Sequence, residues 1–210
     1  MIKKIRLQTL LIIGGIFILA SCQKELSFET EPEVTNPALL GVWAFASLEV
    51  KAVYDLTITD GIDTARTVTT SHYFSKNNVG LLTIEPSSMS LEYYSFSVDT
   101  TVKSKYYENG ELLSEFELPF QTELPPSSSE MPSYRLIGVD SIYFPSGSVL
   151  TMDAGATTLP TEPSGIRYKL DGDRLTLITP ITLNTKETDQ DGITTIKKVD
   201  GLQTAVFQKP

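Results

Sequence analysis

The chain has 210 residues, and its 17 lysines and arginines against 26 aspartates and glutamates give a net charge of −9. Such an acidic surface repels nucleic acid and anionic lipid headgroups, so neither is expected as a partner held by a basic patch. The chain contains one cysteine, Cys22, and one histidine, His72. This composition excludes an internal disulfide, and it predicts no transition-metal site and no cofactor.

Residues 1–21 have the parts of a secretory signal peptide: a basic start, MIKKIR, then an apolar run from Leu10 to Ala20 and small residues before Cys22. A membrane-spanning helix needs about 20 apolar residues, and this run is shorter. We therefore expect a signal rather than a span. The alternatives that remain are an uncleaved anchor and an ordinary signal that leaves a free thiol.

The four residues from Leu19 to Cys22, Leu-Ala-Ser-Cys, resemble the lipobox of bacterial lipoproteins. The resemblance implies cleavage before Cys22 and acylation of its sulfur and amino group with chains such as palmitate. Two or more acyl chains anchor a protein stably, whereas one binds only marginally. Cleavage would leave 14 of the 17 basic residues and all 26 acidic ones. The expected location is therefore the outer membrane, with the acyl chains as the anchor.

Residues 22–38 follow as the acylated cysteine and an acidic tether, because four glutamates, two prolines and few apolar residues cannot form a core. The tether begins Gln23-Lys24-Glu25, which resembles the lysine-plus-acid signal of surface-exposed lipoproteins, although Leu26 stands where a second acid is usual. The periplasmic face and the cell surface both remain open.

Residues 39–210 are about one domain's worth of chain. Short β-branched and aromatic runs alternate with turn dipeptides, namely Asp60-Gly61, Asn109-Gly110, Asp171-Gly172, Asp191-Gly192 and Asp200-Gly201. This rhythm predicts an all-β fold of eight to ten antiparallel strands, joined mostly by hairpins. An up-and-down β-barrel is the expected closure, with a β-sandwich as the alternative.

Two hairpins can be registered from their apolar residues. A two-residue loop at Asp171-Gly172 pairs Tyr168 with Leu175, and a three-residue loop at residues 108–110 pairs Val102 with Phe116. A further pair of strands is expected at residues 133–144 and 148–153. Proline- and serine-rich stretches at residues 118–133 and 154–165 are expected to be long loops.

The stretch NPALLGVW predicts one helical turn at residues 37–40, capped by Asn36, before a long first strand. A helical turn followed by Gly41-x-Trp43 resembles the lipocalin-like (calycin) domains, as does Tyr168-x-Leu170-x-Gly172-Asp173 near the other end. The resemblance implies a barrel whose closed end is plugged by Gly41 and Trp43. Lipocalins usually place an arginine of the last strand over this tryptophan, and the present chain offers Lys209.

The resemblance also implies an apolar ligand held at the open end. Candidate inward-facing residues for such a site are Tyr54, His72, Phe96, Val98, Phe116 and Tyr168. His72 shares a strand face with Val68, Thr70 and Phe74, which suggests an inward position. A structural histidine of the core or rim is the favoured interpretation, and a functional histidine is the alternative. Glu187, Asp189 and Asp191 resemble a calcium loop, yet Lys198 stands where that loop requires glutamate, so an acidic hairpin is predicted.

Three functions are compatible with these patterns. The first is a lipid-anchored, non-enzymatic barrel that binds a small hydrophobic ligand. The second is a surface module that binds a protein or glycan through the loops at residues 118–133 and 154–165. The third, a hydrolase, lacks a recognisable nucleophile, base and acid.

Overall fold

The computed structural model describes residues 36–147 and 163–210, all within one compact unit, Glu33–Pro210. The predicted signal peptide, Cys22 and nearly all of the tether lie outside the described residues, as do the predicted strand at 148–153 and most of the predicted loop at 154–165. The elements are a 3₁₀ turn, η1 (Pro37–Leu39), and the strands β1 (Gly41–Thr59), β2 (Thr64–Phe74), β3 (Lys76–Ile84), β4 (Met89–Glu108), β5 (Glu111–Met131), β6 (Arg135–Ile137), β7 (Ser141–Phe144), β8 (Ser164–Asp171), β9 (Arg174–Thr188) and β10 (Thr194–Gln208).

The strands form one ten-stranded antiparallel sheet with up-and-down connectivity. β1 pairs with β10, so the first and last strands close on each other, while β2 and β3 follow end to end between β1 and β4. The two margins of the sheet are β5 and β6, which residues 132–134 connect. The prediction of an all-β antiparallel barrel with one N-terminal helical turn is confirmed.

Tyr134 holds the connection between β5 and β6 against the turn between β3 and β4. Its backbone N–H donates to the Ser87 carbonyl oxygen (3.3 Å), and its hydroxyl donates to the Glu85 carbonyl oxygen (2.8 Å). The side chain is buried beside Met131. No strand ladder joins β5 to β6 in the described residues. These contacts instead hold the connection between the two strands in place.

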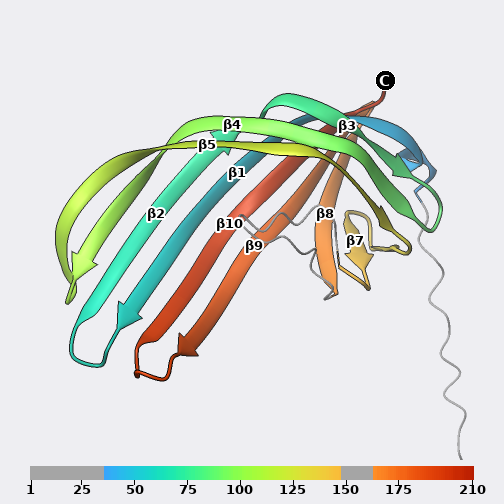
Figure 1. Ribbon diagram of the computed structural model, residues 1–210. Coiled ribbons are helices and arrows are strands. Elements are labelled where there is room, and N and C mark those ends of the chain that lie inside the picture. Colours follow the sequence, from blue (N-terminus) through green and yellow to red (C-terminus); the bar gives the residue numbers. More distant parts are fainter. Residues whose placement is uncertain (1–35, 148–162) are drawn as a thin grey trace, which may run out of the picture. The chain divides into compact units, whose positions relative to one another are not determined.

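The buried core lies at the end of the sheet that contains Trp43, Leu82, Ile142 and Phe207. Figure 1 shows the hairpins β1–β2 and β9–β10 running side by side and extending well past β7 and β8. The sheet therefore has a packed end, lined by short strands, and an open end formed by long hairpins.

The predicted loop at residues 118–133 is wrong, because residues 118–131 belong to β5. β5 pairs only with β4 among the described strands, so it is an edge strand, a position in which prolines such as Pro119, Pro125 and Pro126 are tolerated. Pro125 and Pro126 also coincide with a bulge, between the pairs Phe96–Leu124 and Tyr94–Ser127. The prolines indicated a loop, whereas the structure has an edge strand at this position.

Both predicted hairpin registers are shifted by two residues, with the faces unchanged. Tyr168 pairs with Leu177 because the loop is Gly172-Asp173, and Val102 pairs with Leu118 because a two-residue Asn109-Gly110 turn is followed by a bulge. The predicted turn at Asp200-Gly201 is also wrong. Those residues lie inside β10, where Gly201 faces Ala52.

Candidate functional site

Burial decreases steadily along the inward side of β1. Leu48, Val50 and Ala52 are buried, Tyr54 is half-buried, and Leu56 and Ile58 are exposed. Since alternate residues of a strand point to one face, all of these side chains lie on the inner surface of the sheet. The packed core therefore ends near Tyr54. Beyond this point the inner surface is open and mixed in polarity, because Leu56 lies opposite Lys197 of β10 and Thr67 of β2.

The pairing of β1 with its neighbours, and of β10 with β9, places further apolar side chains near Tyr54 on the inner surface. Tyr54 lies opposite Val199 of β10, Val199 lies opposite Leu183 of β9, and Val50 lies opposite Tyr73 of β2. We define the inner apolar face as the half-buried side chains that pack against the core at its open end: Tyr54, Tyr73, Phe120, Leu124, Ile181 and Val199.

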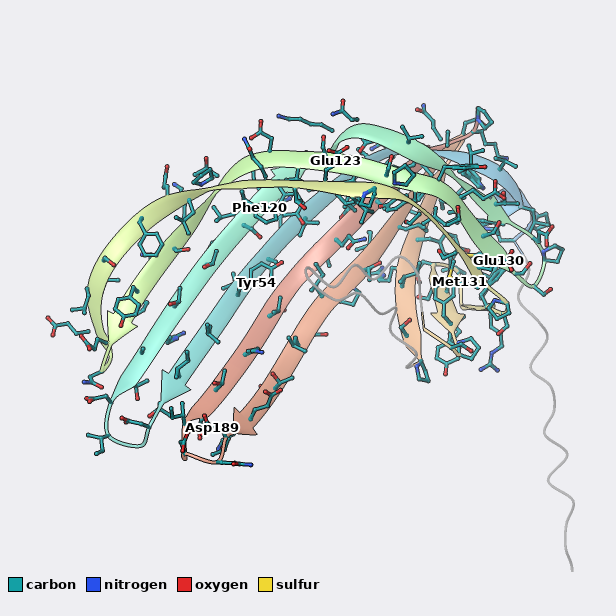
Figure 2. The ribbon with its side chains drawn as sticks, in the orientation of Figure 1. Tyr54, Phe120, Glu123, Glu130, Met131 and Asp189 are labelled. Atoms are coloured by element: carbon teal, nitrogen blue, oxygen red, sulfur yellow. The ribbon has the colours of Figure 1, made fainter. Side chains whose placement is uncertain are left out.

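Figure 2 labels two members of the inner apolar face, Tyr54 on β1 and Phe120 on β5. The ring centroids of Tyr73 and Phe120 are 5.8 Å apart, which links β2 to β5 across β4. The face thus draws on five strands, β1, β2, β5, β9 and β10. Such a surface, apolar and built from distant segments, is typical of a site for a hydrophobic ligand.

Tyr94 of β4 places a hydroxyl group without a hydrogen-bond partner beneath this face. Its ring packs between Phe45 (4.5 Å between centroids) and Phe96 (5.7 Å), and the hydroxyl oxygen is fully buried. A buried hydroxyl left unpaired costs about 1–3 kcal/mol. Tyr94 therefore offers a hydrogen bond that the described residues do not use.

Burial also changes the acidity of the tyrosines. Loss of solvation raises the pKa of Tyr73 to about 12, with a smaller contribution from Tyr54. The same cause, with a contribution from Tyr73, raises the pKa of Tyr94 still further. Tyrosines are protonated at neutral pH in any case, and these shifts extend the range in which Tyr73 and Tyr94 remain hydrogen-bond donors to more alkaline pH.

The inner surface also contains a small number of buried polar side chains, Ser71, Ser104, Thr179 and Gln203. Ser104 shares a hydrogen bond with Thr69 (2.8 Å between hydroxyl oxygens), and the Ser71 hydroxyl donates to the Ala52 carbonyl oxygen (3.4 Å). The hydroxyl groups of Ser104 and Ser71 thus have hydrogen-bond partners within the sheet. The unpaired hydroxyl of Tyr94 differs from them in this respect.

Trp43, predicted to plug one end of the barrel, is fully buried at the packed end. Its Nε1–H donates to the Leu39 carbonyl oxygen of η1 (2.8 Å), and Lys209 Nζ lies 4.9 Å from the ring centroid. Gly41, at the start of β1, has φ of +118°, a value that side chains strongly disfavour. Helical turn, first strand and C-terminal tail therefore meet at Trp43.

The other predicted ligand-site residues divide between three locations. Phe96, Val98 and Tyr168 are buried in the core, and the Tyr168 hydroxyl accepts a hydrogen bond from Asn36 Nδ2 (3.2 Å). Tyr54 lies on the inner apolar face, and Phe116 lies further out on β5, with 39% of its surface exposed. Of the predicted ligand-site residues named here, only Tyr54 is thus part of the inner apolar face.

The predicted inward position of His72 is wrong. His72 lies opposite Lys51, and its side chain is on the outer surface, where Nε2 is 2.8 Å from Glu49 Oε1. It lines a shallow depression of about 290 Å³ together with Lys51 and Asp200. Inward positions on β2 are instead held by Thr69, Ser71 and Tyr73, because β2 pairs with β1 in the register Ala52–Ser71.

The acidic sequence resembling a calcium loop forms the turn between β9 and β10. Asp189, labelled in Figure 2, accepts hydrogen bonds from the backbone N–H groups of Asp191 (3.0 Å) and Ile193 (2.9 Å). Within residues 36–147 and 163–210 no group of three metal-ligating side chains is present. The described part of the chain likewise has no helix long and apolar enough to cross a membrane.

Sequence reasoning missed the principal residues of the inner apolar face. Of the adjacent pair Tyr93-Tyr94, Tyr94 is the buried ring, and a bulge at this point, where Tyr93 has φ of +51°, determines this. The predicted hairpin placed Phe120 opposite Val98 on the apolar face, although the predicted loop at residues 118–133 also included it; the structure pairs Phe120 with Thr100. Comparisons with protein-family models, with curated proteins and with solved structures found no match.

Proposed function

We propose that the protein is a lipid-anchored, non-enzymatic outer-membrane lipoprotein whose barrel binds a small hydrophobic ligand on the inner apolar face. The ligand carries one group that accepts a hydrogen bond. Tyr54, Tyr73 and Phe120 contact its apolar part. Its polar group inserts between the side chains that cover Tyr94 in the unliganded protein and accepts a hydrogen bond from the Tyr94 hydroxyl. The observation that carries this proposal is the apolar inner surface with an unpaired buried donor beneath it.

The apolar surface supports a hydrophobic ligand because it is continuous with the core yet remains partly open. Leu183 of β9, next to Val199, keeps 37% of its surface exposed while pointing inward. Covering apolar surface stabilises a complex by roughly 25 cal/mol per Å². A ligand seated here would extend the core toward the open end and gain that free energy.

The tyrosines support a ligand with a single polar acceptor. Such a group would satisfy the Tyr94 hydroxyl, whose raised pKa keeps its proton in place. A neutral carbonyl or hydroxyl oxygen meets this requirement at a lower desolvation cost than a carboxylate does. The ligand class that we propose is therefore a long-chain alcohol, ester or ketone rather than a free fatty acid.

The lipid anchor is supported by the residues before the barrel. The lipobox-like Leu19-Ala20-Ser21-Cys22 supplies the acylation site, and the acidic tether gives no alternative means of binding a membrane surface. Expression of the full chain in a Gram-negative host with radiolabelled palmitate tests this part. Label is expected on the wild-type chain and not on Cys22→Ser, and label on both would contradict acylation at Cys22.

Ligand binding is tested by titrating the purified full chain with hexadecanol that carries a terminal fluorophore. Leu183→Lys places an ammonium group on the inner surface and is expected to weaken binding at least about tenfold. Leu202→Lys is the matched control, because Leu202 is similarly exposed, at 43%, but lies on the outer surface of the adjacent strand. Equal loss of affinity in both variants would contradict a site on the inner apolar face.

A further inference from the structure

The long edge of β5 is the most extensive unpaired strand surface among the described residues. β5 spans Glu111–Met131 and pairs with β4 alone, so its other side presents backbone N–H and C=O groups. Figure 1 shows β5 along the margin of the sheet, beside β4. Exposed edges of this kind readily accept another strand unless charges, prolines or bulges prevent it.

Pro119 determines which backbone groups of β5 face the edge. Pro119 pairs with Thr101, and since proline has no N–H to donate, its nitrogen must point away from β4. Residues two apart in a strand share this direction, so the N–H groups of Glu117 and Glu115 also point outward. The segment from Ser114 to Leu118, between a bulge and Pro119, can therefore pair with a further strand.

The side chains of this segment are covered on one side only. Phe116 and Leu118 point inward and keep 39% and 46% of their surfaces exposed, whereas the residues opposite them on β4, Ser104 and Val102, are buried. In a sheet, an inward residue is covered by neighbours on both flanking strands. An added strand would supply the missing neighbour for Phe116 and Leu118.

The outward side chains make the segment acidic. Glu115 and Glu117 pair with Lys105 (2.9 Å) and Lys103 (3.6 Å) of β4, and β5 contains five glutamates with no lysine or arginine. Figure 2 labels two other glutamates of this strand, Glu123 and Glu130. On the unpaired side no cation of the described residues forms an ion pair with Glu115 or Glu117, so an incoming strand can supply one.

A second copy of the chain fits this edge poorly. Antiparallel pairing of two β5 strands about Phe116 would place Glu115 of one copy opposite Glu117 of the other, twice. Like charges directly opposite each other destabilise a strand pair. The edge therefore favours a different chain, with basic residues on its outward side.

We propose that residues 114–118 of β5 bind a strand of a partner protein, one in which apolar residues alternate with lysine or arginine. The partner strand extends the sheet through backbone hydrogen bonds to Glu115 and Glu117. Its apolar side chains cover Phe116 and Leu118, and its cations face the two carboxylates. Such strand addition is an established mode of peptide recognition. It does not depend on the ligand of the inner apolar face.

The probe is a synthetic peptide, Lys-Val-Lys-Val-Lys-Val-Lys, added to the full chain in detergent micelles and followed by fluorescence anisotropy. Glu117→Pro removes one outward N–H without affecting the ladder to β4, and Glu117→Ala is its matched control because it removes only the carboxylate. Glu117→Pro is expected to bind the peptide at least about fivefold more weakly than Glu117→Ala. Equal affinities would overturn the proposal.

Two further peptides test the proposal on the wild-type chain, so the result does not depend on whether Glu117→Pro folds. A peptide methylated on alternate backbone nitrogens keeps its charges but cannot form the ladder, and it is expected not to bind. Binding equal to that of the parent peptide would show charge attraction alone and overturn strand addition. A glutamate peptide, Glu-Val-Glu-Val-Glu-Val-Glu, is also expected not to bind. Dimers of the wild-type chain that Glu117→Pro abolishes would overturn the choice of partner.

Discussion

Lys209, next to the last residue of the chain, places its ammonium group over the indole ring of Trp43 in the first strand, with Nζ 4.9 Å from the ring centroid. The backbone N–H of Lys209 donates to the Asp173 carbonyl oxygen (2.9 Å), which fixes the tail beside the turn between β8 and β9. The contact is a cation–π interaction that closes the packed end of the barrel.

Removal of this cation should lower the free energy of unfolding by a modest amount. Lys209→Gln is expected to cost about 0.5–1 kcal/mol, as exposed cation–π pairs do, and Lys209→Arg should retain the stability. Urea denaturation followed by Trp43 fluorescence measures both. Lys169→Gln, an exposed lysine on the outer side of β8, serves as the control, and an equal loss there would contradict a specific role for Lys209.

Tyr94→Phe should not destabilise the protein in the absence of ligand. The substitution removes a buried hydroxyl that has no partner, so we expect unchanged or higher stability, by up to about 1–3 kcal/mol. Tyr134→Phe is the contrasting variant, because it loses the 2.8 Å hydrogen bond to Glu85 and should cost about 0.5–1.5 kcal/mol. A clear loss of stability in Tyr94→Phe would show that its hydroxyl is already hydrogen-bonded.

Alkaline pH should destabilise the fold through Tyr73. An unfolded tyrosine ionises near pH 10, whereas burial raises the pKa of native Tyr73 to about 12. Between these values the unfolded state loses its proton first, so the free energy of unfolding falls as the pH rises from about 10 to 12. Denaturation at a series of pH values should show this slope, and Tyr73→Phe should reduce it. An unchanged slope in the variant would assign the effect to other groups.

Gly201→Ala should be strongly destabilising, because β10 lies very close to β1 at this position. A Cβ atom there would overlap with the Lys51 carbonyl oxygen and would lie 2.7 Å from the Ala52 Cβ. Displacing the strand is expected to cost about 1–3 kcal/mol. Gly165→Ala is a matched control in β8, where the nearest atom is 3.8 Å away, and its thermal midpoint should stay near that of the wild type.

In the two hairpins whose pairing was predicted, the strands and their faces could be predicted from alternation, but the registers could not. A shift of two residues keeps every apolar side chain on the same face, so the pattern fits Tyr168 opposite Leu175 as well as the observed Leu177. In the β8–β9 hairpin the register depends on which two residues form the turn. In the β4–β5 hairpin it depends on a bulge near Leu113. These details depend on local backbone geometry, on which the apolar pattern has no bearing.

The prediction for the candidate site was limited by long-range pairing. On β2 both faces carry aromatic residues, His72 and Phe74 on one and Tyr73 on the other, and only the pairing with β1 shows that Tyr73 points inward. Similarly, three prolines indicated a loop until β5 proved to be an edge. Tyr54 and the core position of Val98 followed from simple alternation, because their strands have one clearly apolar face.

The pairing of β1 with β10 has a consequence for how the protein is made. The ladder joins Ala44 to Gln208, so β1, the first of the described strands to be synthesised, cannot complete its pairing until β10, the last of them, has been made. Contacts between such distant parts of a chain slow folding, because a long loop must first be closed. Until residue 208 is available, β1 and β9 each lack a neighbour and can associate with other chains. Residues 194–208 must therefore be synthesised before the barrel can form, and a chaperone that shields β1 during that interval would raise the yield of folded protein.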